Sequence, residues 1–194
     1  MKTLKTLFFL ILSNVCFGQI IEIIEMPQYT KESIDATNKL RTSLGLNELK
    51  DDAVLDSAAK HHAYYLAYSF LYSIDGGNHY ETIDIPNFKE KLNPEDRAKK
   101  DVNEIQYSYM TGYFKKDSIK STLDLFKSSS YMKGYSSFGD AFIGNYKKSA
   151  PHYKIITKEG VDIFGTFTLL MKIKTPKFSR PCIYMVTVTD SRPL

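Results

Sequence analysis

The sequence DDAVLDSAAKHHAYYLAYSF, at residues 51–70, carries the clearest helical pattern in this chain. Asp51 or Asp52 stands where a helix N-cap is expected, because a short acidic side chain there accepts hydrogen bonds from free backbone N–H groups. Apolar residues then recur at helical spacing and form one stripe. The stripe consists of Leu55, Ala58, Ala59, His62, Leu66 and Phe70. We therefore expect a helix that packs against the core along this stripe.

A further helix is expected upstream. Thr30 is a plausible N-cap, and Gly45 is a suitable stop, since glycine tolerates the left-handed conformation of a C-cap. Leu46 then follows as the apolar residue that such a cap often buries. Residues 19–25 are rich in isoleucine and predict a short strand or an ordered arm, which Pro27 ends.

The end of the chain predicts two strands. Residues 161–171 and 182–188 each place apolar side chains on one face, and residues 174–181, with two prolines, would join them as an antiparallel hairpin. Because helices come first and an antiparallel pair comes last, the pattern predicts an α+β fold.

The middle of the chain has a weaker pattern, with mixed character over residues 79–117 and a helix start at Pro94. Further expectations there are a turn at 75–78, extended chain at 83–88, a short amphipathic helix at 118–126, a flexible serine-rich loop or insertion at 128–139, and a helix at 140–156 that breaks near Ala150-Pro151.

The length of 194 residues suits a single domain with a proper core. Residues 1–18 read as a secretory signal peptide, with a cationic start, a short apolar run and cleavage expected between Gly18 and Gln19. Residues 19–29 then form an N-terminal arm, and residues 30–194 form the domain. A lipid anchor at Cys16 is disfavoured, and the apolar run is too short to be a transmembrane segment. We expect a secreted or periplasmic protein.

Charge and cysteine content exclude some classes of function. The formal net charge is +4, and removing residues 1–18, with two lysines and no acids, leaves 24 − 22 = +2. So small a charge argues against nucleic-acid binding and against electrostatic attachment to membranes. Cys182 is the one cysteine after residue 18, so no internal disulfide is possible, and its apolar surroundings predict an inert packed thiol.

The chain lacks a phosphate-binding glycine loop, a zinc-protease helix motif, paired cysteines and a serine nucleophile elbow, so attention falls on its four histidines. His62 lies on the helical stripe and is expected to be a core histidine bonded to nearby backbone. His61 lies off the stripe and is expected to be solvated. His79 follows a Gly-Gly turn, and His152 follows Pro151 at the end or kink of a helix.

His79 and His152 are the candidates for chemistry. Two imidazoles with a carboxylate such as Glu81 would hold Zn²⁺ with an open position, or share protons in an acid–base cluster. The alternative is that the two histidines lie in unrelated loops.

The order of several motifs resembles the bacterial branch of the CAP superfamily, the group of SCP-like extracellular domains. The similarity spans roughly residues 33–190 and rests on Asn38, Arg41, Gly45-Leu46, Leu49, Asp52, Leu55, Ala59, His62-Ala63, Tyr65, His79, Asp96-Arg97-Ala98, Tyr146, Ser149, His152 and Ile155-Ile156. Two departures stand out. Tyr146 replaces the tryptophan of the family pattern, and the usual Gly-Glu-Asn segment is missing, its nearest counterpart being Asn103-Glu104-Ile105.

This resemblance implies an α-β-α sandwich with a central antiparallel sheet and a surface cleft. The implied cleft residues are His79, His152, Ser149 and Tyr146, with Glu104 or Glu81 supplying a carboxylate. Some related domains bind a divalent metal such as Zn²⁺ at the histidine pair.

Three functions follow as hypotheses. The first is a secreted, non-enzymatic binding module that presents the histidine-lined cleft to a small apolar, polymeric or protein ligand. The second is a metal-dependent hydrolase in which the histidine pair holds Zn²⁺ and Glu104 or Glu81 is the general base. The third is an envelope structural protein with a vestigial site.

Overall fold

The structure is a computed structural model that describes residues 19–72, 79–82, 85, 92–110, 121–174 and 182–194. Its central sheet has the strand order β1-β4-β5-β3, with every neighbouring pair in that order antiparallel, and β2 pairs with β4 in parallel. The strands are β1 (Gln19–Glu25), β2 (Lys50–Asp51), β3 (Asn103–Met110), β4 (Ile163–Lys174) and β5 (Cys182–Arg192).

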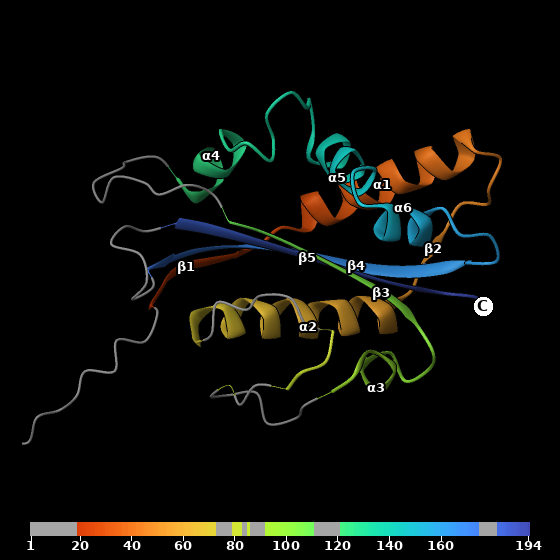
Figure 1. Ribbon diagram of the computed structural model, residues 1–194, viewed down its shortest axis with the longest axis horizontal. Helices are drawn as coiled ribbons and strands as arrows, with labels where there is room; N and C mark the ends of the chain where they lie inside the picture. Colours follow the sequence, from red (N-terminus) through yellow and green to blue (C-terminus); the bar gives the residue numbers. More distant parts are fainter. Residues whose placement is uncertain (1–18, 73–78, 83–84, 86–91, 111–120, 175–181) are drawn as a thin grey trace, which may run out of the picture.

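Helices cover both faces of this sheet, which Figure 1 shows edge-on between two helical layers. One layer holds α2 (Ala53–Tyr72) and α3 (Pro94–Ala98). The other holds α1 (Pro27–Ser43), α4 (Thr122–Lys127), α5 (Phe138–Tyr146) and α6 (Ala150–Ile156). The expected α+β sandwich with a central antiparallel sheet is therefore confirmed.

The core lies in two layers, one on each side of the sheet. Under α2, Val186 and Val188 of β5 pack with Ala63 and Leu66. On the opposite face, β5 contributes Ile183 and Met185 to a cluster rich in aromatic rings from α1, α4 and α5. Since successive strand residues point to opposite faces, a strand covered on both sides is buried along its length, as β5 is.

Two pairs of buried threonines join β4 to β5 on the face toward α1. The Oγ1 atoms of Thr166 and Thr189 lie 2.9 Å apart, and those of Thr168 and Thr187 lie 3.0 Å apart. Each pair stands directly opposite in the ladder, so these hydroxyls satisfy one another across the strands.

Several local predictions are confirmed. Asp52 caps α2, its Oδ1 accepting from the backbone N–H groups of Val54 and Leu55, both at 3.0 Å, and the whole predicted stripe is buried. Gly45 has φ +74°, as a left-handed C-cap requires. The terminal strands pair as expected, and residues 19–25 form a strand of the sheet.

One local prediction is wrong, one holds only in part, and one strand was not predicted. The first helix begins at Pro27, not at Thr30, because proline already has the φ of a first helical position; the Thr30 hydroxyl instead accepts from Thr168 N at 3.2 Å. The serine-rich segment forms turns up to Ser137, as expected of a loop, but it is not loose, since Tyr131 and Phe138 are buried in the core. Strand β3 lies in the region read as mixed. The expected turn at 75–78, most of the extended chain at 83–88 and the segment joining β4 to β5 lie outside the described residues.

Candidate functional site

A buried arginine, Arg97, is the centre of a charged cluster beneath α2. Its Nη1 donates to Glu81 Oε1 at 3.1 Å and to the carbonyl of Leu92 at 2.7 Å. Its Nη2 donates to Glu104 Oε2 and to the carbonyl of His79 at 3.1 Å. The side chains of Arg97, Glu81 and Glu104 are all at most 2% exposed. One guanidinium thus pairs two buried carboxylates and fixes two loop carbonyls.

The sequence of α3 explains how Arg97 reaches this position. Asn93 caps the short helix by accepting from Asp96 N at 2.7 Å, and Pro94 occupies its first turn without losing a hydrogen bond. The helix then ends at once, with Lys99 at φ +57°. A single turn fixed at both ends therefore holds Arg97 against α2 and β3.

Two adjacent histidines of α2 complete the cluster. His62 Nδ1 lies 3.1 Å from Glu81 Oε1, and its Nε2 lies 3.1 Å from Gln106 Oε1 and 3.6 Å from Glu104 Oε1. His61 Nε2 lies 3.1 Å from Glu81 Oε2. His62 is buried as expected, but its partners are side chains and not nearby backbone, because the facing layer supplies carboxylates. His61 is half-buried and paired, so the prediction of a solvated residue is wrong.

The cluster keeps both glutamates ionised. Burial would raise the pKa of Glu81, but hydrogen bonds from His61 and His62 outweigh it and hold that pKa at about 2. Burial acts in the same sense on Glu104, where the hydrogen bond from His79 and the charges of His62 and Arg97 lower the pKa below its usual value.

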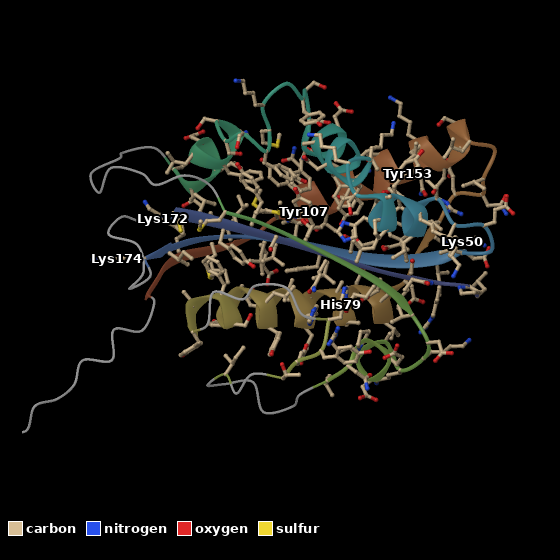
Figure 2. The ribbon with its side chains drawn as sticks, viewed as in Figure 1. Lys50, His79, Tyr107, Tyr153, Lys172 and Lys174 are labelled. Carbon is tan, nitrogen blue, oxygen red and sulfur yellow. The ribbon has the colours of Figure 1, made fainter. Side chains whose placement is uncertain are left out.

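His79 is the point where this cluster meets solvent. Its Nδ1 lies 2.8 Å from Glu104 Oε1, and its side chain is 44% exposed. Figure 2 shows it on the α2 side of the sheet, beside β3. The buried carboxylate orients an exposed imidazole, as the second shell of a binding site does.

His152 lies in the first turn of α6, directly after the break between α5 and α6, as expected, and in the opposite helical layer. Burial and then the charge of His79 lower the pKa of His152, so the two rings are within electrostatic reach. Its Nδ1 is buried and has no hydrogen-bond partner in the described part of the chain. That the two rings line one cleft remains a prediction.

The other two predicted cleft residues lie beside His152. The ring of Tyr146 is fully buried, with its centroid 5.4 Å from that of His152, so it supports the imidazole from within the core. Ser149 is the N-cap residue of α6, but its side chain makes no capping hydrogen bond.

The residues do not fit a closed metal centre. No three His, Cys, Asp or Glu side chains gather in a metal-binding arrangement within the described segments. The carboxylates nearest to His79 already bond to Arg97, which competes with a cation for the same oxygens. Cys182 contributes nothing here: it is buried, and burial raises the pKa of its thiol to about 11, as expected for an inert residue.

Arg97 and Gln106 are the residues that sequence reasoning missed. Arg97 enters the sequence analysis only in a helix start and in the family pattern, with no role of its own, although a lone arginine amid acids is a candidate buried ion-pair partner. Glu104 and Gln106 are two residues apart, the spacing that places polar side chains on one face of a strand. Recognising β3 would have shown both pointing toward His62.

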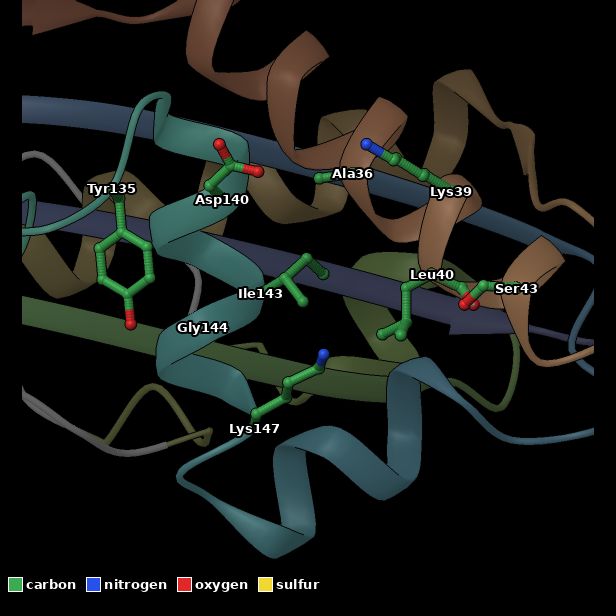
Figure 3. A pocket seen from close by; sticks show the side chains of 9 residues that line it. All are labelled: Ala36, Lys39, Leu40, Ser43, Tyr135, Asp140, Ile143, Gly144 and Lys147. Atoms are coloured by element: carbon green, nitrogen blue, oxygen red, sulfur yellow. Dashed lines mark hydrogen bonds between the residues drawn. The ribbon is translucent and has the colours of Figure 1, made fainter.

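A separate groove lies between α1 and α5, with a volume of about 410 Å³. Figure 3 shows Leu40 of α1 and Ile143 of α5 between the two helices, with the lysines at its rim. Its lining comprises Ala36, Lys39, Leu40, Ser43, Tyr135, Asp140, Ile143, Gly144 and Lys147. The groove therefore combines an apolar floor with two cationic side chains and one acid.

Comparisons with known proteins agree with this architecture. The family model of cysteine-rich secretory proteins, CAP, matches residues 34–168. The fold is similar to that of an outer surface protein from Borrelia burgdorferi, with 18% identity and a TM-score of 0.52 over 89% of this chain and 98% of that one. An extracellular protein containing an SCP domain from Bacillus anthracis is also similar, at 14% identity and a TM-score of 0.45 over 86% of this chain and 41% of that one. No curated protein matches the chain.

Proposed function

Because the chain belongs to the CAP family of cysteine-rich secretory proteins, we propose that it is an extracytoplasmic binding module that receives a small amphiphilic ligand and performs no chemistry on it. The observation that carries this proposal is the groove between α1 and α5. Its floor suits an apolar body, and Lys39 and Lys147 at the rim suit an acidic group.

The charged cluster argues against the hydrolase hypothesis. A general base needs a lone pair within hydrogen-bond reach of a substrate or water. Glu81 and Glu104 instead bond to Arg97 and to imidazoles, and both are buried. The cluster therefore serves to hold His79 at the surface, where we propose that it and His152 form a second, polar contact for the ligand.

Placement outside the cytoplasm is also part of the proposal. The predicted signal peptide at residues 1–18 supports it, and the structurally similar Borrelia protein is an outer surface protein. Within the described segments, none of the helices has the length and apolarity that crossing a bilayer requires.

The groove proposal predicts saturable binding of an anionic fluorescent fatty-acid analogue. Leu40→Asp places a charge on the apolar floor and should weaken binding at least about tenfold, since burying an unpaired charge costs more than about 1.4 kcal/mol. Leu44→Asp is the matched control, because Leu44 is 49% exposed and lies outside the groove lining. Equal affinity in both variants, or no binding by the unaltered protein, would contradict the proposal.

Calorimetric titration with Zn²⁺ tests the hydrolase alternative separately. Heat that disappears in both His79→Ala and His152→Ala, together with zinc-dependent ester hydrolysis, would favour an enzyme. We expect neither.

A further inference from the structure

Asp190 is a buried acid that none of the interactions above uses. It is 1% exposed and lies on β5, directly opposite Glu104 of β3 on one side and Gly165 of β4 on the other. Directly opposed residues of an antiparallel pair point to the same face. Asp190 and Glu104 therefore lie side by side beneath α2.

Neither oxygen of Asp190 has a hydrogen-bond partner in the described part of the chain. The terminal nitrogens of Arg97 donate to Glu81 and Glu104, and Arg192 donates to the carbonyl of Ala98 at 2.9 Å. The Nε of Arg97 is buried and forms no hydrogen bond with Asp190 or with any other described group. Burying an ionised carboxylate without a donor is strongly unfavourable, so this environment favours the neutral form of the acid.

The other neighbours offer no donor. Gly165 has no side chain, and a Cβ there would lie 2.2 Å from the backbone of α2, so the space is filled. From α2, His62 faces Glu104, and Asp56 bonds to Thr166 N at 3.1 Å. Glu104 is therefore the polar group left beside Asp190. A proton on Asp190 turns this contact between two acids into a hydrogen bond.

We propose that Asp190 is a neutral carboxylic acid that keeps its proton and donates a hydrogen bond to Glu104, and that it thereby positions Glu104 to hold His79. The pair then carries one negative charge, on Glu104, which lies against the guanidinium that Arg97 shares with Glu81. Loss of the proton to solvent at alkaline pH would place two charges side by side and weaken the hold on His79. The inference does not depend on a ligand in the groove between α1 and α5.

The sign of the pH dependence follows from burial, which raises the pKa of Asp190 well above its ordinary value, as does the charge of Glu104. Between the unfolded pKa of about 4 and the folded pKa, the folded chain retains a proton that the unfolded chain releases, so this group stabilises less as pH rises. Asp190→Asn keeps a donor toward Glu104 and has no proton to lose. It should raise Tm at about pH 8, with the difference shrinking toward about pH 4.

Infrared spectroscopy of the whole protein tests the protonation directly. We expect the carbonyl band of a protonated carboxyl group at about pH 7, absent in Asp190→Asn and retained in Asp35→Asn, whose acid is exposed and paired with Lys31. An unchanged band, or a lower Tm of Asp190→Asn at about pH 8, would overturn the neutral acid.

The positioning role has its own measurement, the imidazole ¹⁵N signals of His79. Asp190→Leu removes the donor and should shift these signals, whereas Asp190→Asn should leave them in place. If Asp190→Leu does not fold, Asp190→Asn still tests the positioning role. The asparagine amide can donate to Glu104 as the protonated acid does, so displaced His79 signals in Asp190→Asn would contradict the proposal.

Discussion

At the scale of single residues, the guanidinium of Arg97 holds the charged cluster together. It is planar and always charged, and its two terminal nitrogens serve different glutamates, Glu81 and Glu104. Lysine offers one compact charge and cannot span both. The same side chain also holds the carbonyl of His79, so packing and presentation of the imidazole depend on one residue.

Arg97→Leu should destabilise the protein by about 3–5 kcal/mol, because it leaves two buried carboxylates without a balancing charge. The measurement is urea unfolding at neutral pH, with Lys100→Ala as a control on an exposed cation in the same segment. Similar unfolding midpoints for the two variants would show that the cluster contributes nothing to stability.

The contacts between individual side chains of the charged cluster are the part of the structure that the sequence predicted least well. The burial of His62 is a local consequence of its place on the helical stripe of α2. The partners of His62 and His79 are Glu81 and two residues of β3, Glu104 and Gln106, and no local pattern specifies which carboxylate meets which imidazole. The secondary-structure propensity of a residue does not predict which side chains tertiary folding brings into contact.

At the scale of elements, a clear sequence pattern gave a correct prediction. Helix α2 has both a cap and a stripe, and the terminal strands have long apolar faces. Strand β3 also alternates, with Glu104 and Gln106 on the face toward the charged cluster and Ile105 and Tyr107 on the face toward the aromatic cluster. This alternation is the sequence signal that could have identified the strand.

The approach of α2 to the sheet depends on Gly165. A Cβ at this position would lie 2.2 Å from Asp56 N and from the carbonyl carbon of Leu55, so the helix would have to move away. Gly165→Ala should cost about 3 kcal/mol through overpacking, and α2 carries His61 and His62 with it.

Chemical denaturation checks this, with Ser57→Ala on the exposed side of the same helix as control. The control should stay within about 0.5 kcal/mol of the unaltered protein. If Gly165→Ala were as stable as the Ser57→Ala control, α2 would not pack as closely against β4 at this position as the structure indicates.

At the scale of the whole molecule, the acid cluster shapes the stability profile. The pKa of Glu81 is about 2 in the folded protein and about 4 when unfolded, so its contribution is present above about pH 4 and is lost as pH falls toward 2.

Glu81→Gln should therefore be less stable at neutral pH, by about 3 kcal/mol, with the difference fading below about pH 4. Thermal unfolding across this range measures it, and Glu159→Gln, on an exposed turn, is the control. A difference that persisted undiminished at about pH 2 would point to lost packing and not to charge.

The paired threonines between β4 and β5 have a consequence for assembly of the hairpin. Thr166 meets Thr189 and Thr168 meets Thr187, all buried. If one strand slid by two residues, its apolar faces would still match, but at most one threonine pair would survive. The other two hydroxyls would then lose their partner across the strands. The two threonine pairs thus fix the register of β4 against β5. Apolar side chains alone would tolerate a pairing shifted by two residues.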